Sequence, residues 1–254
     1  MAEKILEVHG HPEIITFTNV FAHIEDLGGV LNALKVLQDK NTKIVIENHY
    51  LGAVLDGNQF DTFYHEHPRT YSYTSFKFMA KTLGVELEAV EFPSRYGGNI
   101  RVFMGQDSQL KNQESLVKLD VKESLFENQF NGLQLNIKKW LTSKKLIIQS
   151  AFERYGKIRA KAFPGRSAIL VKMLDIDENI ISAVYEKPGS LKIDHYVPGT
   201  RIPILSDDDL LASDDLGKPL LNLAWHISEE IHGYLERSGY TGTITDILDI
   251  DDFA

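Results

Sequence analysis

The spacing of hydrophobic and polar residues predicts alternating strands and helices in the first part of the chain. Short β-branched apolar runs indicate buried strands, and apolar residues spaced three and four apart indicate amphipathic helices. The pattern places these elements in the order strand 13–18, helix 27–37, strand 42–47, helix 75–83, strand 85–92 and strand 100–103. Asp26 is positioned to cap the first helix. Such alternation is typical of an α/β sheet.

The middle of the chain carries a longer helical pattern. Between residues 122 and 155, apolar side chains mostly recur three and four positions apart, which predicts one long helix or two broken ones despite Gly132. The outer face of this segment is rich in lysine, and we expect it to be solvated. We also expect the segment to link two halves of the protein.

The last part of the chain returns to the α/β pattern. It predicts strands at 158–163, 180–185, 220–224 and 244–248, with helices at 167–174 and 228–237. Acidic clusters at 207–209 and 249–252 are expected in surface loops or helix caps, because neither has the ligand spacing of a calcium loop. We therefore divide the chain into three predicted parts, residues 1–110, 111–156 and 157–254.

Composition and charge narrow the classes of function. The chain has 254 residues and 27 basic against 36 acidic side chains, a net charge of −9, which disfavours non-specific binding to nucleic acid. No apolar run reaches the ~18 residues of a membrane-spanning helix, and the N-terminus lacks the apolar core of a signal peptide. With no cysteine, the chain can form neither a disulfide nor a cysteine zinc site. We expect a cytoplasmic protein that binds neither nucleic acid nor membrane.

The densest group of acid/base side chains lies at residues 61–67, which include Tyr64, His65, Glu66 and His67. We expect this run on a loop beyond a strand end, where open α/β sheets bind ligands. A histidine there can remove a proton from carbon beside a ketone, a carboxylate can orient it, and a tyrosine can stabilise the enolate. The zinc pattern HExxH is absent. The pattern alone leaves acid/base chemistry, a metal site and a structural loop open.

Three weaker signals accompany this run. Asn19 and His23 follow the first predicted strand and either face a ligand crevice or satisfy loop backbone. The turn at 164–167 places Arg166 at a helix N-terminus, which suits either a phosphate or a simple cap. The glycine pairs at 28–29 and 97–98 belong to no dinucleotide or ATP fingerprint, and no GxSxG nucleophile turn is present.

One segment is specific enough to indicate a family. Residues 57–67, GNQFDTFYHEH, resemble the signature of SAM-dependent nucleotide-sugar C-methyltransferases, which methylate the carbon beside a ketone in deoxysugar biosynthesis. Four further segments, at 18–24, 96–102, 196–204 and 223–231, resemble in the same order the family segments NVxAH, GGSxRV, PGTxIPI and LxWxxxxEI. Together the resemblance extends over residues 5–246.

The resemblance implies a fold and a site. It implies an incomplete class I methyltransferase-like sheet, a helical connector and a Rossmann-like C-terminal α/β domain that holds a nucleotide-diphosphate sugar. By motif position His67 corresponds to the base that removes the proton beside the ketone, and Tyr64, Glu66 and His23 line the same pocket. Arg166 takes the basic position of the family's PAKG turn. The side chains expected to bind substrate are Asn19, His65, Arg101, Arg166 and Tyr196.

The resemblance also implies what this sequence lacks. Members of the family begin with a cysteine-rich zinc module and a glycine-rich loop that grips SAM, and this sequence begins after both. We therefore expect no zinc, and SAM as the cofactor with weak or undetectable binding by this chain alone. The strand at 13–18 would then have an exposed hydrophobic edge, which an N-terminal chain or a homo-oligomer could cover.

Three functions follow from these expectations. The first is a sugar C-methyltransferase or its catalytic half. The second is a nucleotide-sugar epimerase or isomerase that exchanges the proton without SAM. The third is a non-catalytic remnant that binds a nucleotide sugar.

Overall fold

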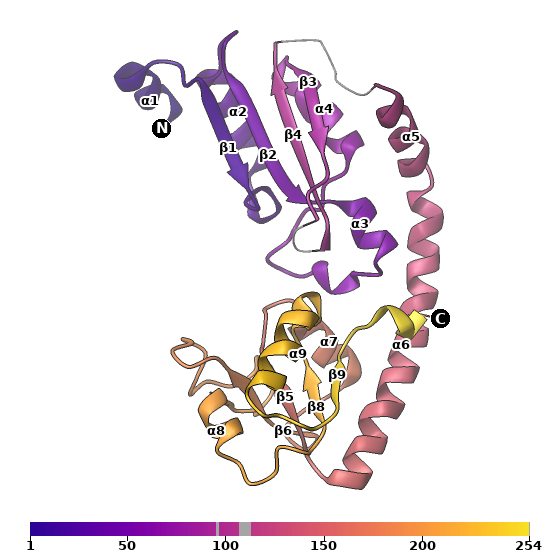
Figure 1. Ribbon diagram of the computed structural model, residues 1–254. Coiled ribbons are helices and arrows are strands. Elements are labelled where there is room, and N and C mark those ends of the chain that lie inside the picture. The colour runs from indigo at the N-terminus through magenta and orange to yellow at the C-terminus, as the bar shows by residue number, and fades with distance from the viewer. Residues whose placement is uncertain (95–96, 107–112, 254) are drawn as a thin grey trace. The chain divides into compact units, whose positions relative to one another are not determined.

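The computed structural model describes residues 1–94, 97–106 and 113–253 (Figure 1). It forms two compact units, Met1–Leu133 and Gln134–Ala254, and the boundary falls inside the long helix α6, Phe126–Tyr155. Each unit contains its own sheet, and the expected α/β class is confirmed. The predicted division into three parts stays a prediction.

The N-terminal unit is built on a mixed sheet of four strands in the order β1-β2-β4-β3. The strands are β1 Ile14–Thr18, β2 Lys43–His49, β3 Glu86–Glu91 and β4 Asn99–Gly105. β1 and β2 run parallel, whereas β4 is antiparallel to both β2 and β3. The four strands predicted for this part are confirmed, and β1 lies at an edge of the sheet.

The helices that lie wholly in this unit are α1 Ala2–His9, α2 Leu27–Leu37, α3 Leu51–Asp56, α4 Tyr73–Leu83 and α5 Gln113–Glu123. Side chains cap the start of α2 and α4, whereas the first residues of α1 and α3 have no side-chain cap. The predicted cap of α2 is confirmed, because the Asp26 carboxylate accepts a hydrogen bond of 2.8 Å from the Gly29 N–H. Ser72 and Ser75 form a reciprocal capping box at the start of α4, and Gly84 ends this helix in the left-handed conformation.

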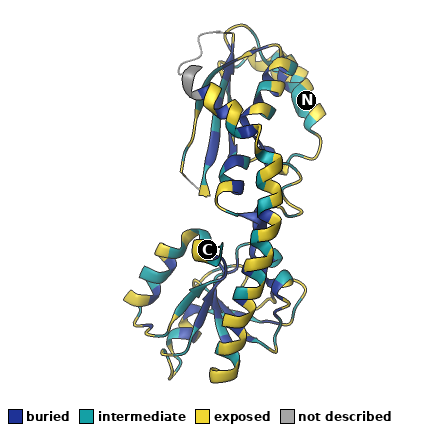
Figure 2. Ribbon diagram, turned by 90° about the vertical axis from the view of Figure 1, so that its right-hand side faces the viewer, coloured by how far each residue is buried: buried dark blue, intermediate teal, exposed yellow. Residues whose placement is uncertain are grey.

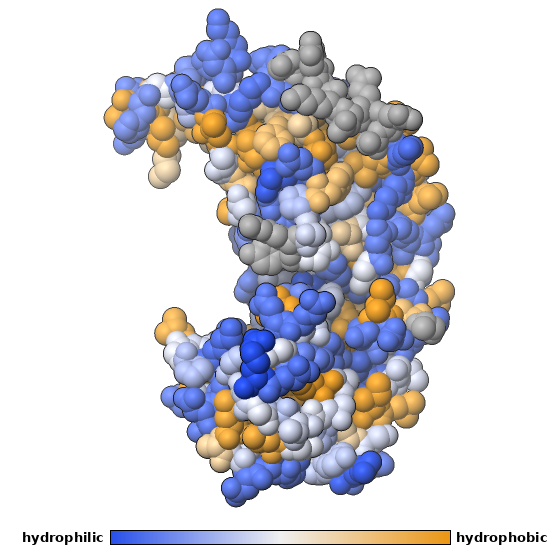
Figure 3. Space-filling model, viewed as in Figure 1, coloured by the Kyte–Doolittle hydropathy of each residue, from blue (hydrophilic) through white to orange (hydrophobic). Residues whose placement is uncertain are grey.

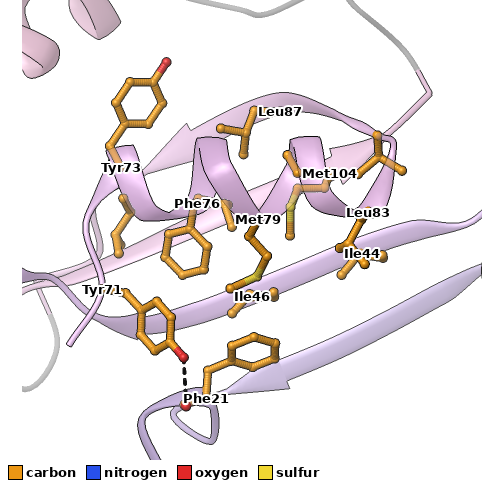
Figure 4. Packing of buried hydrophobic residues seen from close by; sticks show 14 of the residues in the cluster. Phe21, Ile44, Ile46, Tyr71, Tyr73, Phe76, Met79, Leu83, Leu87 and Met104 are labelled. Atoms are coloured by element: carbon orange, nitrogen blue, oxygen red, sulfur yellow. Dashed lines mark hydrogen bonds between the residues drawn. The ribbon is translucent and has the colours of Figure 1, made fainter. Parts of the chain in front are cut away.

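The core of the N-terminal unit lies between α4 and one face of the sheet (Figure 4). Phe76 and Met79 point from α4 toward Ile44 and Ile46 of β2, and all four side chains are buried. Full burial of one such side chain stabilises the fold by about 1.5–3 kcal/mol. Strand residues of the opposite parity, such as Lys43 and Val45, point to the other face and are only half-buried. The packing of α4 therefore buries one face of this sheet.

The other face carries apolar and charged side chains together. Ile14 is 62% exposed at the edge of this face, and Lys43 is ion-paired with Glu88 across it. Figure 3 shows this mixture as orange and blue patches over the N-terminal unit.

The C-terminal unit is built on a sheet of five parallel strands in the order β7-β6-β5-β8-β9. These strands are β5 Ile158–Lys161, β6 Ile181–Glu186, β7 Ile204–Ser206, β8 Leu220–Asn222 and β9 Ile244–Asp246. The helices α7 Ser167–Leu174, α8 Asp207–Leu211 and α9 Ser228–Arg237 follow β5, β7 and β8 respectively. The strand order reverses between β5 and β8, which is the switch point where open α/β sheets bind ligands.

The long helix α6 confirms the predicted helical segment from Phe126 to Tyr155, while Lys122 belongs to α5. Within the C-terminal unit, the Trp140 indole N–H donates to the Ile247 carbonyl at 2.8 Å. The expectation of a solvated lysine face is wrong at Lys144, which is 2% exposed and ion-paired with Asp252 at 2.9 Å. Lys144 is buried because it lies on the side of α6 that packs against the C-terminal strand.

Three short helices were not predicted from the sequence. The helices α3 and α8 have six and five residues, too few for a helical period to stand out, and α1 was also not predicted. The cluster at 207–209 forms α8, and its first residue Asp207 is fully buried in an ion pair with Lys161. The expected helix cap is confirmed at Asp209, which forms a capping box with Ser206, whereas the burial of Asp207 was not expected. Figure 2 shows how buried residues concentrate in the strands of both sheets, whereas α1 has none.

Candidate functional site

The carboxyl ends of β1 and β2 lie side by side, and the polar residues that follow β1 begin there. Asn19 adopts a left-handed backbone conformation (φ 52°), and its N–H donates to the Glu47 carbonyl of β2 at 2.8 Å. The chain then forms the short 3-10 turn η1, Phe21–His23. Phe21 is fully buried, and its carbonyl accepts a hydrogen bond of 3.2 Å from the Tyr71 hydroxyl. These contacts hold His23 at the surface beside the strand ends.

Residues 64–67 form a turn rather than a strand. The His67 N–H donates to the Tyr64 carbonyl at 2.8 Å, which makes His65 and Glu66 the central residues of the turn. The side chain of His65 is 87% exposed, and its Nε2 lies 3.9 Å from a Glu66 carboxylate oxygen. In a strand His65 and His67 would share one face; in this turn His67 is half-buried and His65 is exposed.

The turn brings His67 into contact with two other rings. The ring centroids of His23 and His67 are 4.7 Å apart, and those of Tyr64 and His67 are 4.6 Å apart. The Tyr64 hydroxyl donates to Glu66 at 3.3 Å. The structure thus places together the four residues that the sequence assigns to one pocket. Two imidazoles, a phenol and a carboxylate can transfer and stabilise a proton among them.

A buried carboxylate organises the strand ends beneath this group. Glu47 is 4% exposed and accepts hydrogen bonds from Asn99 Nδ2 at 2.8 Å and Arg101 Nε at 2.7 Å. Arg101 also pairs with Glu91 at 3.0 Å. The hydrogen bond with Glu47 raises the pKa of Arg101 above its usual value. Arg101 is therefore engaged by two carboxylates of its own sheet.

The glycine pair near 97–98 fixes the loop that precedes the turn. Gln59 donates to the Gly97 carbonyl at 2.8 Å. A Cβ on Gly97 would lie 2.5 Å from Gln59 Oε1, and a Cβ on Gly98 would lie 2.6 Å from the Cβ of Ala53. Both glycines have positive φ, so only glycine permits this approach without strain. The pair therefore serves packing between two loops.

The C-terminal unit holds the other two predicted substrate residues. The Arg166 guanidinium lies 5.0 Å from the centroid of the Trp225 ring, at the ends of β5 and β8. Backbone N–H groups of Ser167 and Ala168 donate to the carbonyls of the preceding turn. An anion at this helix end would therefore rely on the Arg166 side chain. Tyr196 is 54% exposed, and Arg201 lies 5.9 Å from its ring centroid.

A metal ion and SAM are the two cofactors to consider, and the described residues provide a site for neither. They contain no group of three His, Asp or Glu side chains that could hold a metal ion. Gly29 lies in the first turn of α2 under its Asp26 cap, and Gly97 packs on Gln59, so neither pair forms a SAM-binding turn. This part of the chain therefore does not fit a SAM cradle. No helix of the described residues is long and apolar enough to cross a membrane.

The two sheets with their flanking helices are consistent with an α/β protein of the methyltransferase-like class. Residues 94–244 match the family described as C-methyltransferase C-terminal domain, and the chain belongs to that family. It is 25% identical over 240 residues to the C-methyltransferase NovU of Streptomyces niveus, across 91% of this chain and 56% of the relative. The chain therefore spans about half the length of that relative, and its function is related to methyl transfer.

Several residues of the site carried no signal in the sequence. Glu47 is the last residue of the strand predicted at 42–47. Only the pairing of β2 with β4 places Glu47 opposite Arg101. Trp225 is distant in sequence from Arg166. Gln59 lies inside the segment that indicates the family. Its contact with Gly97 could not be predicted, because the two residues are brought together only in the folded chain.

Proposed function

We propose that this chain is the substrate-activating part of a sugar C-methyltransferase. The observation that carries the proposal is the contact of His67 with His23 and Tyr64 at the carboxyl ends of parallel strands. In this proposal a ring nitrogen of His67 accepts the proton from the carbon beside a ketone. The electron pair of the broken C–H bond forms the enolate double bond, and the ketone oxygen becomes negative. The Tyr64 hydroxyl donates a hydrogen bond to that oxygen.

The neighbouring side chains support this base. In the free chain the Tyr64 hydroxyl donates its single hydrogen to Glu66, and in this proposal the hydroxyl turns from Glu66 to the ketone oxygen when substrate binds. The His23 ring lies against the His67 ring, which would gain the positive charge. We propose Asn19 and His65 as polar groups around the same substrate, and a nucleotide-diphosphate sugar as that substrate. Within the C-terminal unit, taken by itself, Arg166 and Tyr196 are proposed to bind a nucleotide diphosphate.

We propose SAM as the methyl donor of the complete enzyme, where its sulfonium supplies an electrophilic methyl group. Because the described residues do not fit a SAM cradle, the proposal assigns SAM binding to another segment or chain. The edge of β1, whose outer side pairs with no strand of the described residues, is the surface we propose for that partner. Calorimetry on the chain alone should detect weak or no SAM binding, and micromolar affinity would contradict this assignment.

Hydrogen exchange tests the proposed base without SAM. A keto-deoxysugar nucleotide incubated with the chain in deuterated water should exchange the hydrogen beside its ketone. His67→Asn should slow this exchange by ~10²–10⁴-fold, the usual contribution of a general base. His65→Asn is the matched control and should slow it less, because His65 points into solvent.

The products separate the remaining alternatives. Exchange followed by methylation, once SAM and a SAM-binding partner are added, supports the proposal. Exchange with inversion but without methylation would identify an epimerase. Binding of the nucleotide sugar without exchange would refute the assignment of His67 and leave a binding protein.

A further inference from the structure

Asn99 connects the buried carboxylate of the N-terminal sheet to the loop that carries His23. Its Nδ2 donates to Glu47 Oε1 at 2.8 Å and to Asn19 Oδ1 at 3.2 Å. The Asn99 side chain is 1% exposed, so water cannot readily replace either contact. One amide group thus joins the first residue of β4 to the residue that follows β1.

The loop it holds is short and is fixed at two points. At one end, Asn19 has a left-handed conformation, which costs free energy for a residue other than glycine. At the other end, buried Phe21 is held by Tyr71. Val20 alone separates these two anchors, and His23 follows directly in the same 3-10 turn. A change at Asn19 would therefore be transmitted to the His23 ring.

We propose that Asn99 is a positioning residue, which holds Asn19 and thereby keeps the His23 ring against His67. The inference rests on the proposed function of His67 as the base. Asn99 stands at the position where the family segment GGSxRV has serine. A serine side chain is shorter by an amide group and cannot span both acceptors. The two hydrogen bonds that join Glu47 to Asn19 therefore depend on asparagine at position 99.

The ion pair below Asn99 sets the geometry of the bridge. Arg101 contacts Glu47 Oε2 through both Nε at 2.7 Å and a terminal nitrogen at 2.6 Å. The remaining oxygen of Glu47 then faces Asn99. This arrangement gives Arg101 a structural task inside the sheet and makes Glu47 the fixed point from which Asn99 reaches the loop.

Histidine NMR tests the proposal independently of activity. Wild type should show a nuclear Overhauser contact between the His23 and His67 rings. In Asn99→Ser this contact should weaken and the ring signals of both residues should shift, while His195 and His232 of the other unit stay unchanged. Glu91→Gln is the matched control, because it removes only the exposed contact with Arg101. Unchanged His23 and His67 signals in folded Asn99→Ser would overturn the proposal.

Exchange kinetics supply the second readout. Asn99→Ser should lower kcat for hydrogen exchange by ~10–100-fold with little change in KM, because a misplaced catalytic group affects the reaction more than binding. Asn19→Gly, which keeps the left-handed backbone but loses the acceptor, should shift the His23 and His67 ring signals as Asn99→Ser does; the ring signals are its readout because Asn19 is also proposed to contact substrate. If wild type shows no exchange, the proposed function fails, and the NMR contact still decides the role of Asn99. If Asn99→Ser lowered the melting temperature but left kcat unchanged, the role of Asn99 would be structural only, and the proposed positioning of His23 would be contradicted.

Discussion

The two units of this protein place polar side chains at the same position in their topology but use them differently. In the C-terminal unit, the strand-end residues Lys161, Asp207 and Asn222 are buried and satisfy one another or neighbouring groups. In the N-terminal unit, His23 and His65 are exposed beside half-buried His67. Charges that are buried and paired fix strand ends, whereas titratable groups in contact with solvent can exchange protons. The proposed proton transfer therefore uses the solvent-accessible titratable groups of the N-terminal unit.

The C-terminal network is built around two buried ions. Lys161 and Asp207 are each 1% exposed, and their atoms lie 2.8 Å apart. Around Asp246, hydrogen bonds arrive from Ser228 at 2.5 Å and Asn222 at 2.6 Å, and His232 lies 3.3 Å away. Because these groups are occupied by one another, the switch point of this sheet offers a ligand mainly Arg166 and Trp225. In the proposed function, this unit binds substrate through Arg166.

The largest expected effect is on the stability of the C-terminal unit. Asp207→Ala leaves the Lys161 ammonium buried without its counter-ion and should destabilise this unit by about 3–5 kcal/mol. The matched change in the N-terminal unit is Asp120→Ala, which breaks a pair with Lys77 that is 39% and 47% exposed, and should cost at most about 1 kcal/mol.

Urea unfolding followed by fluorescence measures the first change, because both tryptophans, Trp140 and Trp225, lie in the C-terminal unit. Circular dichroism follows both units. The double variant Lys161→Met, Asp207→Leu should recover most of the lost stability, since it removes both charges together. Equal effects of Asp207→Ala and Asp120→Ala would show that burial does not distinguish the two pairs.

A smaller effect is expected on ligand binding by the C-terminal unit. A nucleotide-diphosphate sugar should raise the melting temperature of the chain by mass action. Arg166→Ala should weaken its binding by about 1–3 kcal/mol, the scale of a charge-assisted hydrogen bond. Lys172→Ala, at the exposed far end of α7, is the control and should bind as wild type does. If Arg166→Ala and Lys172→Ala bound the nucleotide sugar equally well, the Arg166 guanidinium would play no part in binding.

The contrast between the units also explains what the sequence could and could not predict. Strands and long helices follow from local periodicity, so β1, β2 and α6 were predicted to within a few residues. The helix cap at 207–209 was among the predicted alternatives, but the burial of Asp207 could not be predicted, because its counter-ion Lys161 lies 46 residues away.

For the candidate site, residues close in sequence could be predicted and distant partners could not. The run from Tyr64 to His67 and the strand-end position of His23 are local signals. The bridge from Asn99 to Asn19 spans 80 residues and depends on the order of strands in the sheet. The period of a strand fixes which residues share a face, but only pairing decides which strand supplies the partner.

The smallest expected effect concerns a buried tyrosine of the N-terminal unit. The Tyr50 hydroxyl donates to Glu123 at 3.1 Å, and burial, with Glu123 second, raises the pKa of Tyr50 above its usual value. Glu123 also accepts from the Tyr73 and Thr74 N–H groups at 2.7 and 2.8 Å, so it stays hydrogen-bonded without Tyr50. Tyr50→Phe should therefore cost only about 1 kcal/mol at neutral pH.

The same substitution should change the alkaline limb of stability. A folded-state pKa above the unfolded value of ~10 contributes stability that is fully present below pH ~10 and is lost as pH rises through the folded value. Wild type should thus lose stability above pH ~10, and Tyr50→Phe should lose less in the transition followed by circular dichroism. The fluorescence transition of the C-terminal unit should keep its pH dependence, because Tyr185 and Tyr240, whose pKa values burial also raises, are untouched. An equal alkaline slope in wild type and variant would show that Tyr50 is free to ionise in the folded unit.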